Sequence, residues 1–146
     1  MPVVRGCQFP DELLYDVENH IWFQEIEGGN LKLGMTSVAV AMAGQLVAFT
    51  PKKVGRGVKA GKSCATIESG KWVGPAKSLA AGEVVEINED MVETPSLAND
   101  DPYGRGWLVI LKPEDWDSVK GSLTPGAELE APYEAKMAAD GFDGCS

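Results

Sequence analysis

Short runs rich in β-branched and aromatic residues recur along the chain, and each run is bounded by Gly, Pro, Asn or Ser. Runs of this length and composition are typical of β-strands. Several such strands joined by glycine-containing turns indicate a sandwich or a barrel. The pattern therefore predicts a mainly β protein, with strands over residues 20–26, 31–35, 46–49, 64–67, 82–88 and 106–111.

Short helices are predicted beside these strands. Thr36 and Ser37 are good N-caps for a helix over residues 37–43, and Gly44 is suited to end that helix. Other segments are too rich in Gly, Pro and polar residues for regular structure. The sequence thus predicts further helices over 113–119 and 132–139, loops over 51–61 and 89–103, a turn region over 68–82 and a frayed tail over 142–146.

Length and composition indicate one globular domain over residues 1–146. The chain is 44% hydrophobic and 24% charged, which is ordinary for a soluble protein. Its longest apolar run, over residues 38–43, is far too short to cross a membrane, and the first residues contain no apolar signal segment. We therefore expect a cytoplasmic protein with no membrane partner.

The formal net charge of −9 makes the protein acidic and argues against nucleic acid as a partner. The charge is unevenly distributed. Residues 1–73 have eight bases and seven acids, whereas residues 74–146 have five bases and fifteen acids. Between residues 28 and 67 there is no acid at all, but there are six bases: Lys32, Lys52, Lys53, Arg56, Lys59 and Lys62.

Catalytic and metal-binding motifs are missing from the sequence, which contains no P-loop, GxSxG, GxGxxG or HExxH pattern. The three cysteines, Cys7, Cys64 and Cys145, include no CxxC pair, so neither a disulfide framework nor a zinc site is predicted. His20 is the only histidine. We therefore predict no catalytic residues and no metal ligands. A thiol redox protein using Cys7 or Cys145 is a further class, although neither has a visible resolving cysteine.

One lysine stands apart from the other surface charges. Lys71 falls at the predicted turn after the strand that ends near residue 67, where its side chain would point away from the protein body. Such a lysine is often only a solubilising charge, but a modifying enzyme can also reach it. Glu68 lies three residues before Lys71, and Gly82 lies eleven residues after it.

This spacing resembles the lipoylation site of the glycine cleavage H-protein family. Further segments resemble the same family: His20 with Trp22, the run LGMTSVAVAMAGQLVAF, the run AAGEVVEIN and the run DPYGRGWLVILKP. The resemblance covers residues 14–139 and leaves residues 1–13 and 140–146 as terminal extensions. Biotin carriers share the topology but place their lysine between methionines, whereas Gly70 and Trp72 flank Lys71.

The resemblance implies a barrel-sandwich hybrid of two sheets with short flanking helices and the lysine at a hairpin tip. It implies lipoate joined covalently to Lys71, with Glu68 and Gly82 recognised by a lipoate ligase or by the enzymes of lipoyl synthesis. His20, Trp72 and Gly70 are candidate contacts for the lipoyl arm. A protein of this kind is a monomeric carrier that serves other enzymes as their substrate and is not itself an enzyme.

Two departures from the family pattern concern the cargo of the arm. The family has a Glu between the His and the Trp and an Asp four residues after the lysine, and this pair of carboxylates holds the ammonium of the aminomethyl cargo. Here the two positions are Ile21 and Pro75. The segment over residues 52–62 is also basic where the family usually has acids.

These departures favour a branch of the family that resembles the lipoate-binding proteins of heterodisulfide-reductase-like sulfur oxidation. Its partners would be enzymes like dihydrolipoamide dehydrogenase and heterodisulfide reductase, and a basic face near the arm would suit an anionic sulfur cargo. The alternative is the glycine cleavage H protein itself, with glycine decarboxylase and aminomethyltransferase as partners. A third reading is an unlipoylated scaffold or regulatory protein that kept the fold.

Overall fold

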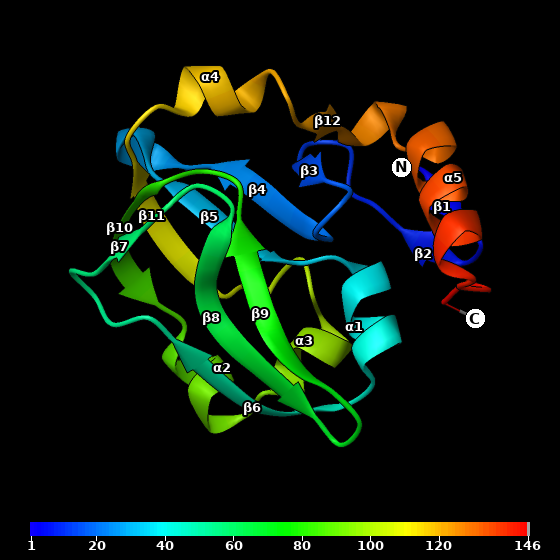
Figure 1. Cartoon of the computed structure of the whole chain (residues 1–146), viewed down its shortest axis with the longest axis horizontal. Helices are drawn as coiled ribbons and strands as arrows, with labels where there is room; N and C mark the ends of the chain where they lie inside the picture. The colour runs from blue at the N-terminus through cyan, green and yellow to red at the C-terminus, as the bar shows by residue number, and fades with distance from the viewer. Residues whose placement is uncertain (146) are drawn as a thin grey trace.

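The computed structural model describes residues 1–145, and Figure 1 shows two main sheets with helices around them. The larger sheet has the strand order β12-β3-β4-β5-β11-β10-β7, and the smaller has the order β6-β8-β9. A separate pair, β1-β2, lies beside the C-terminal helix. The strands are β1 Val3–Val4, β2 Cys7–Gln8, β3 Leu14–Asp16, β4 Ile21–Glu25, β5 Leu31–Met35, β6 Leu46–Pro51, β7 Gly57–Val58, β8 Lys62–Ser69, β9 Val73–Ser78, β10 Gly82–Ile87, β11 Val109–Pro113 and β12 Thr124–Pro125.

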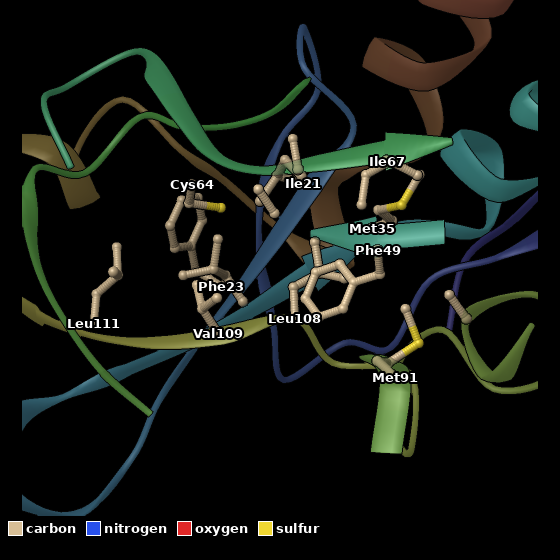
Figure 2. Close-up of a cluster of buried hydrophobic side chains, with 14 of the residues drawn as sticks. Ile21, Phe23, Met35, Phe49, Cys64, Ile67, Met91, Leu108, Val109 and Leu111 are labelled. Atoms are coloured by element: carbon tan, nitrogen blue, oxygen red, sulfur yellow. The ribbon is translucent and has the colours of Figure 1, made fainter. Parts of the chain in front are cut away.

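The main core lies between the two sheets. In β8, Cys64 and Ile67 are fully buried while Glu68 is exposed, as expected where one face of a strand covers a core. Figure 2 shows Phe23 from β4 and Phe49 from β6 in this cluster. The predicted mainly β sandwich of two sheets with short helices is therefore confirmed.

Helix α1, Ser37–Ala43, follows the prediction residue for residue. The Thr36 side chain accepts a hydrogen bond from the Ala39 amide at 3.2 Å, so it caps the helix. Gly44 ends the helix with φ +85°, a conformation that favours glycine. The other helices are α2 Glu89–Glu93, α3 Leu97–Asp100, α4 Trp116–Lys120 and α5 Glu130–Asp140, with single 3₁₀ turns at Glu27–Gly29 and Gly126–Glu128.

Three predicted loop or turn regions contain regular structure. Strand β9 occupies residues 73–78 because β8 continues to Ser69 and offers a free edge with which β9 pairs. Strand β7 lies inside the predicted loop 51–61, and helices α2 and α3 lie inside the predicted loop 89–103. The two helices bury Met91 and Leu97, and this tertiary contact outweighs their polar local sequence.

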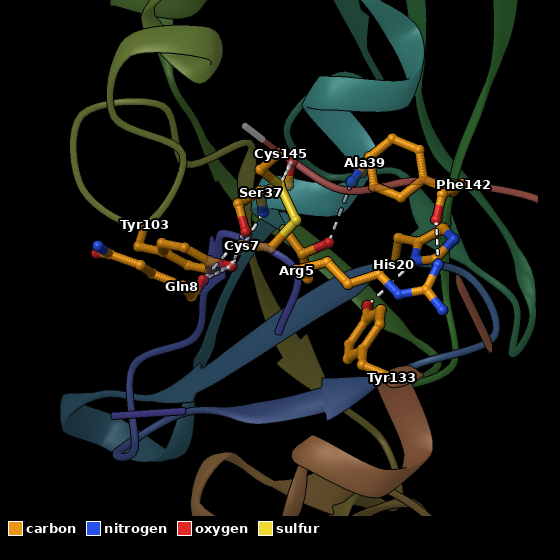
Figure 3. Close-up of a disulfide and its surroundings, with 11 residues drawn as sticks. Arg5, Cys7, Gln8, His20, Ser37, Ala39, Tyr103, Tyr133, Phe142 and Cys145 are labelled. Carbon is orange, nitrogen blue, oxygen red and sulfur yellow. Dashed lines mark hydrogen bonds between the residues drawn. A yellow bond between two sulfur atoms is a disulfide. The ribbon is translucent and has the colours of Figure 1, made fainter. Parts of the chain in front are cut away.

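The two termini are joined by a disulfide between Cys7 and Cys145, with 5.0 Å between their Cα atoms (Figure 3). The prediction that the chain has no disulfide was therefore wrong. The tail is also not frayed over residues 142–145, because the Cys145 amide donates to the Arg5 carbonyl at 2.9 Å. Ser146 lies outside the described residues. Along the described part of the chain, no helix combines the length and apolarity needed to cross a bilayer.

Candidate functional site: a hairpin lysine beside an apolar pocket

Lys71 occupies the tip of the β8–β9 hairpin, as the sequence predicts. The last strand pair is Glu68 with Val73, and the Ser69 amide donates to the Trp72 carbonyl at 2.8 Å. The Ser69 side-chain oxygen accepts from the Lys71 amide at 3.3 Å. These contacts give the turn a defined shape, so the backbone of Lys71 is held at the end of the hairpin (Figure 1).

The Lys71 side chain lies along the C-terminal end of α1. A Cβ atom placed on Gly44 would lie 3.1 Å from Lys71 Cε and 3.8 Å from Nζ. Any residue other than glycine would therefore press against the lysine stem at this point. The close approach places the amine at the edge of a pocket between the hairpin, α1 and the start of β4.

This pocket has a volume of about 480 Å³ and is mostly apolar. It joins the hairpin to segments that are distant in sequence. Its lining residues are Asn19, His20, Ile21, Met35, Ala39, Met42, Ala43, Lys71, Trp72, Pro75 and Ala76. None of these eleven described residues is Asp or Glu, so the pocket wall offers Lys71 and any group attached to it no carboxylate.

Ile21 and Pro75, the two departures noted in the sequence, both line this pocket. Ile21 is 1% exposed and belongs to the main core, whereas Pro75 is on the exposed face of β9. The structure therefore brings together two positions that are 54 residues apart in the sequence. An ammonium group in this pocket would lack a charged partner from either position.

The His20 side chain is held in place by contacts with helix α5. Its backbone has φ +57°, which is uncommon for a residue other than glycine. Its Nδ1 lies 3.1 Å from the hydroxyl of Tyr133, and its Nε2 lies 3.9 Å from Asp140 (Figure 3 shows His20 and Tyr133). Both partners belong to α5, so this helix fixes one wall of the pocket. No sequence signal pointed to Tyr133 or Asp140.

Burial, and then the charge of Lys136, lower the pKa of His20 below its ordinary value of 6.5, although Asp140, Asp16 and Glu18 act in the opposite direction. The folded state therefore binds fewer protons than the unfolded state. Stability from this group is complete above pH 6.5 and is lost as pH falls from 6.5 toward the lowered pKa.

We expect His20→Asn to flatten this part of the pH dependence, because asparagine does not titrate and tolerates positive φ. The measurement is the urea midpoint of unfolding between pH 5 and 8, compared with that of the wild-type protein. An unchanged slope below pH 6.5 in the variant would show that another group is responsible.

Two further candidate contacts for the arm differ in their position relative to the pocket: Trp72 lines it and Gly70 does not. The Trp72 indole lies over Gly74, since a Cβ atom there would be 2.2 Å from the ring, and the side chain lines the pocket while remaining 40% exposed. Gly70 is exposed and is not among the pocket-lining residues.

Known proteins resemble this chain over nearly its full length. The glycine cleavage H-protein family matches residues 13–136. Glycine cleavage system H protein 5 of Aquifex aeolicus is 52% identical over 139 residues, which cover 90% of this chain and 93% of that protein. The probable glycine cleavage system H protein 2 of Sulfurisphaera tokodaii is 40% identical over 131 residues, covering 88% of each chain.

A solved structure agrees with these sequence matches. The crystal structure of a glycine cleavage system H protein from Mycobacterium marinum superposes with a TM-score of 0.74 at 33% identity, covering 88% of this chain and 98% of that one. The chain belongs to the glycine cleavage H-protein family. H proteins carry lipoate covalently on a lysine, and they are carriers rather than enzymes.

The surroundings of Lys71 fit the lipoyl group of an H protein. The amine is at an exposed tip, where a modifying enzyme can reach it, and the adjoining pocket is lined by apolar side chains and by the thioethers of Met35 and Met42. A lipoyl chain is a hydrocarbon that ends in a disulfide ring, and thioether and methyl groups suit its burial. Among the described residues, no cluster of His, Cys, Asp and Glu has the arrangement of a metal site.

Glu68 and Gly82 are not neighbours in this H-protein fold. Glu68 is exposed on β8, close to the tip. Gly82 begins β10, four residues beyond Ser78, which pairs with Lys62 at the other end of the hairpin. With eight residues in β8, the two ends of the hairpin are roughly 23 Å apart. Gly82 has a structural reason to be glycine, because a Cβ atom there would lie 2.5 Å from the Lys112 carbonyl oxygen.

The basic segment is likewise far from Lys71. Its first lysine, Lys52, donates its amide to Cys64 near the start of β8, and its last, Lys62, pairs with Ser78. Figure 1 shows the hairpin tip at the lower right and the connection from β6 to β7 at the left. The expectation of a basic face near the arm was therefore wrong, because β6 leads the chain away from the tip before this segment begins.

Proposed function

We propose that Lys71 is the lipoylated residue of this H protein, and that the whole chain acts as a single carrier domain. One observation supports this assignment above the others: among the lysines in the described residues, only Lys71 is both at the hairpin tip and at the edge of the 480 Å³ apolar pocket. The lipoyl group supplies dithiol and disulfide chemistry when attached. The chain itself supplies the tether, a resting place for the arm and the surface that partner enzymes recognise.

The exposed carboxylate of Glu68 is the group we assign to recognition by the lipoylating enzyme. It lies on the same hairpin as Lys71, and its backbone is fixed by pairing with Ala48 and Val73 on either side. Gly82 contributes indirectly by allowing β10 to pack against β11. We further propose that the carrier is monomeric and works in the cytoplasm.

For the cargo, we propose the aminomethyl group of glycine cleavage. The names of the relatives from Aquifex aeolicus and Sulfurisphaera tokodaii support this role, as does that of the structural neighbour. The partner enzymes would then be glycine decarboxylase, aminomethyltransferase and dihydrolipoamide dehydrogenase.

A second candidate cargo is a sulfur intermediate, handed to enzymes like heterodisulfide reductase. The observation that favours it is the pocket wall, in which Ile21 and Pro75 replace the two carboxylates expected for an ammonium cargo. A neutral or anionic cargo needs no such partner, whereas a desolvated ammonium does. The basic segment no longer supports this candidate, because it lies at the other end of the hairpin.

Loading of the lipoylated protein by glycine decarboxylase in the presence of glycine separates the two candidates. Glycine cleavage predicts an arm that carries one methylamine, detected by intact mass. We expect Pro75→Asp to raise the loaded fraction about fivefold, the effect of a single charge-assisted hydrogen bond worth about 1 kcal/mol. Pro75→Asn is the uncharged control. The sulfur candidate would be favoured if glycine decarboxylase loaded neither the wild type nor Pro75→Asp with methylamine, while a persulfide did load the arm with sulfur.

A further inference from the structure

The Cys7–Cys145 disulfide lies at one end of α1, and the Lys71 amine lies at the other. Cys145 Sγ is 3.7 Å from the carbonyl oxygen of Ser37, the first residue of the helix. Lys71 Nζ approaches Gly44, the residue that ends the helix. The two cysteines that form the disulfide lie outside the 13–136 match to the family.

The length of the arm matches this separation. From Ser37 to Gly44 the helix rises about 10 Å, at 1.5 Å per residue. Seven covalent bonds connect the lysine nitrogen to the nearer lipoyl sulfur, and they span roughly 9 Å when extended. The flexible lysine stem adds further reach. An arm attached to Lys71 can therefore bring its sulfur to the end of α1 where the disulfide lies.

The accessible side chains of α1 between the two sites are small or apolar. Ala39 and Met42 both line the Lys71 pocket, and Ser37, whose carbonyl oxygen is near Cys145 Sγ, is half-buried at the start of the helix. Figure 3 shows Ala39 at the same end of α1 as the disulfide. An arm attached to Lys71 would therefore pass Met42 and Ala39 on its way to the end of α1 where Cys145 lies.

The two sulfur atoms of the pair differ in access. Cys7 is 0% exposed, whereas Cys145 is partly exposed near the end of the chain. Thiol–disulfide exchange requires a thiolate to approach the sulfur that it attacks. The geometry therefore selects Cys145 as the atom attacked and Cys7 as the leaving thiolate.

We propose that the reduced lipoyl arm on Lys71 exchanges with the Cys7–Cys145 disulfide of the same molecule. The inference rests on the proposed attachment at Lys71. A lipoyl thiolate bonds to Cys145 Sγ, the bond between Cys145 and Cys7 breaks, and Cys7 takes up a proton. The second lipoyl thiolate then closes the lipoyl disulfide and releases Cys145, which is also protonated. Two electrons and two protons pass from the lipoyl dithiol to the cysteine pair, so no other oxidant is needed.

Through this exchange, the redox state of the lipoyl arm would determine whether the disulfide that joins the N-terminal and C-terminal segments is closed or open. The disulfide is one of several contacts that hold the last residues, together with the donation from the Arg5 guanidinium to the Phe142 carbonyl at 2.9 Å. A tether keeps the two reacting groups at a high effective concentration, so the intramolecular reaction has an advantage over exchange between molecules.

The test uses the full-length lipoylated protein with Cys7→Ser, in which Cys145 has lost its disulfide partner and is a free thiol that can attack the oxidised arm. Iodoacetamide alkylates the lipoyl thiol that this attack releases and so traps the mixed disulfide. Cys145→Ser is the matched control, because it breaks the same disulfide but leaves the buried Cys7 as the remaining thiol of that pair. Non-reducing peptide mass spectrometry measures the cross-linked peptides in each variant. The cross-link between the Lys71 and Cys145 peptides in Cys7→Ser should be at least tenfold more abundant than the cross-link between the Lys71 and Cys7 peptides in the control. Its yield should not depend on protein concentration, because the reaction is intramolecular.

Equal cross-linking in the two variants, or none in either, would overturn the proposal. Cys64 serves as an internal reference, because burial raises the pKa of its thiol to about 12 and it should not react. The intact mass of the protein before the reaction distinguishes a failure of lipoylation from a failure of the exchange. A protein without a lipoyl group on Lys71 contradicts the proposed carrier site, whereas a lipoylated protein without the cross-link contradicts only the exchange.

Discussion

Lys71→Arg is expected to abolish carrier activity. Arginine keeps the positive charge at the hairpin tip, but its guanidinium does not form the stable amide that a lysine amine forms with lipoate. We expect turnover with the partner enzymes to fall by about 100-fold or more, to the background rate, although the two side chains carry the same charge. The measurement is the rate of arm reduction by dihydrolipoamide dehydrogenase with NADH, after incubation with the lipoylating enzyme.

The matched control is Lys77→Arg. Lys77 is exposed on β9 of the same hairpin, and it pairs with Ser63 near the opposite end of β8. The same chemical change there should leave turnover within about twofold of wild type, since exposed charges contribute little. Retained turnover in Lys71→Arg would contradict the assignment and would favour a protein that keeps the fold without carrying lipoate.

Gly82→Ala is expected to destabilise the protein without any direct effect on the lipoylation reaction. The new Cβ atom would lie 2.5 Å from the Lys112 carbonyl oxygen and 3.1 Å from Pro113 Cα. Both atoms belong to the backbone of β11, which is paired with β5 and β10 and cannot move aside easily. Overpacking of this kind costs about 1–3 kcal/mol, so Tm should fall by roughly 3–10 °C.

The comparison that isolates this effect is Gly57→Ala. Gly57 lies in β7, pairs with Glu83 beside Gly82, and has no atom within 4 Å of an added Cβ. Its replacement should change Tm by about 2 °C or less. Lipoylation of Gly82→Ala should be normal at a temperature where the variant is folded. A variant with wild-type Tm that is not lipoylated would instead show direct recognition of Gly82.

Local chemistry was enough to predict some elements from the sequence. Thr36 and Gly44 define the ends of α1 by side-chain capping and by positive φ, and both effects depend on neighbouring residues alone. Lys71 at a hairpin tip could be predicted in the same way, because Ser69 and Gly70 mark the end of a strand. The resemblance then gave that lysine a chemical role that its position did not.

Other features depend on contacts between distant segments. Strand β9 contains Gly74 and Pro75, which disfavour a strand, yet it forms because β8 provides a partner along its whole length. The disulfide joins residues separated by 138 positions, and no spacing rule connects them. The basic segment looked close to the arm because Lys62 precedes Lys71 by nine residues, but an extended strand carries those nine residues away from the tip.

The pocket beside Lys71 could be predicted from the sequence only in part. The substitutions at Ile21 and Pro75 were visible in the sequence, and the structure shows that both affect the same wall. The support that α5 gives this wall through Tyr133 and Asp140 was not visible, because a histidine alone does not identify its partners. The sequence therefore identified only some of the residues that shape the pocket in which the cargo would lie.

We propose that Lys71 carries the lipoyl group. The most direct test is peptide mass spectrometry of the protein purified from its native cells, with every lysine mapped. We predict one lipoyl amide, located on Lys71, and no modification of the exposed Lys77 on the same hairpin. An unmodified Lys71, or a lipoyl group on any other lysine, would contradict the account.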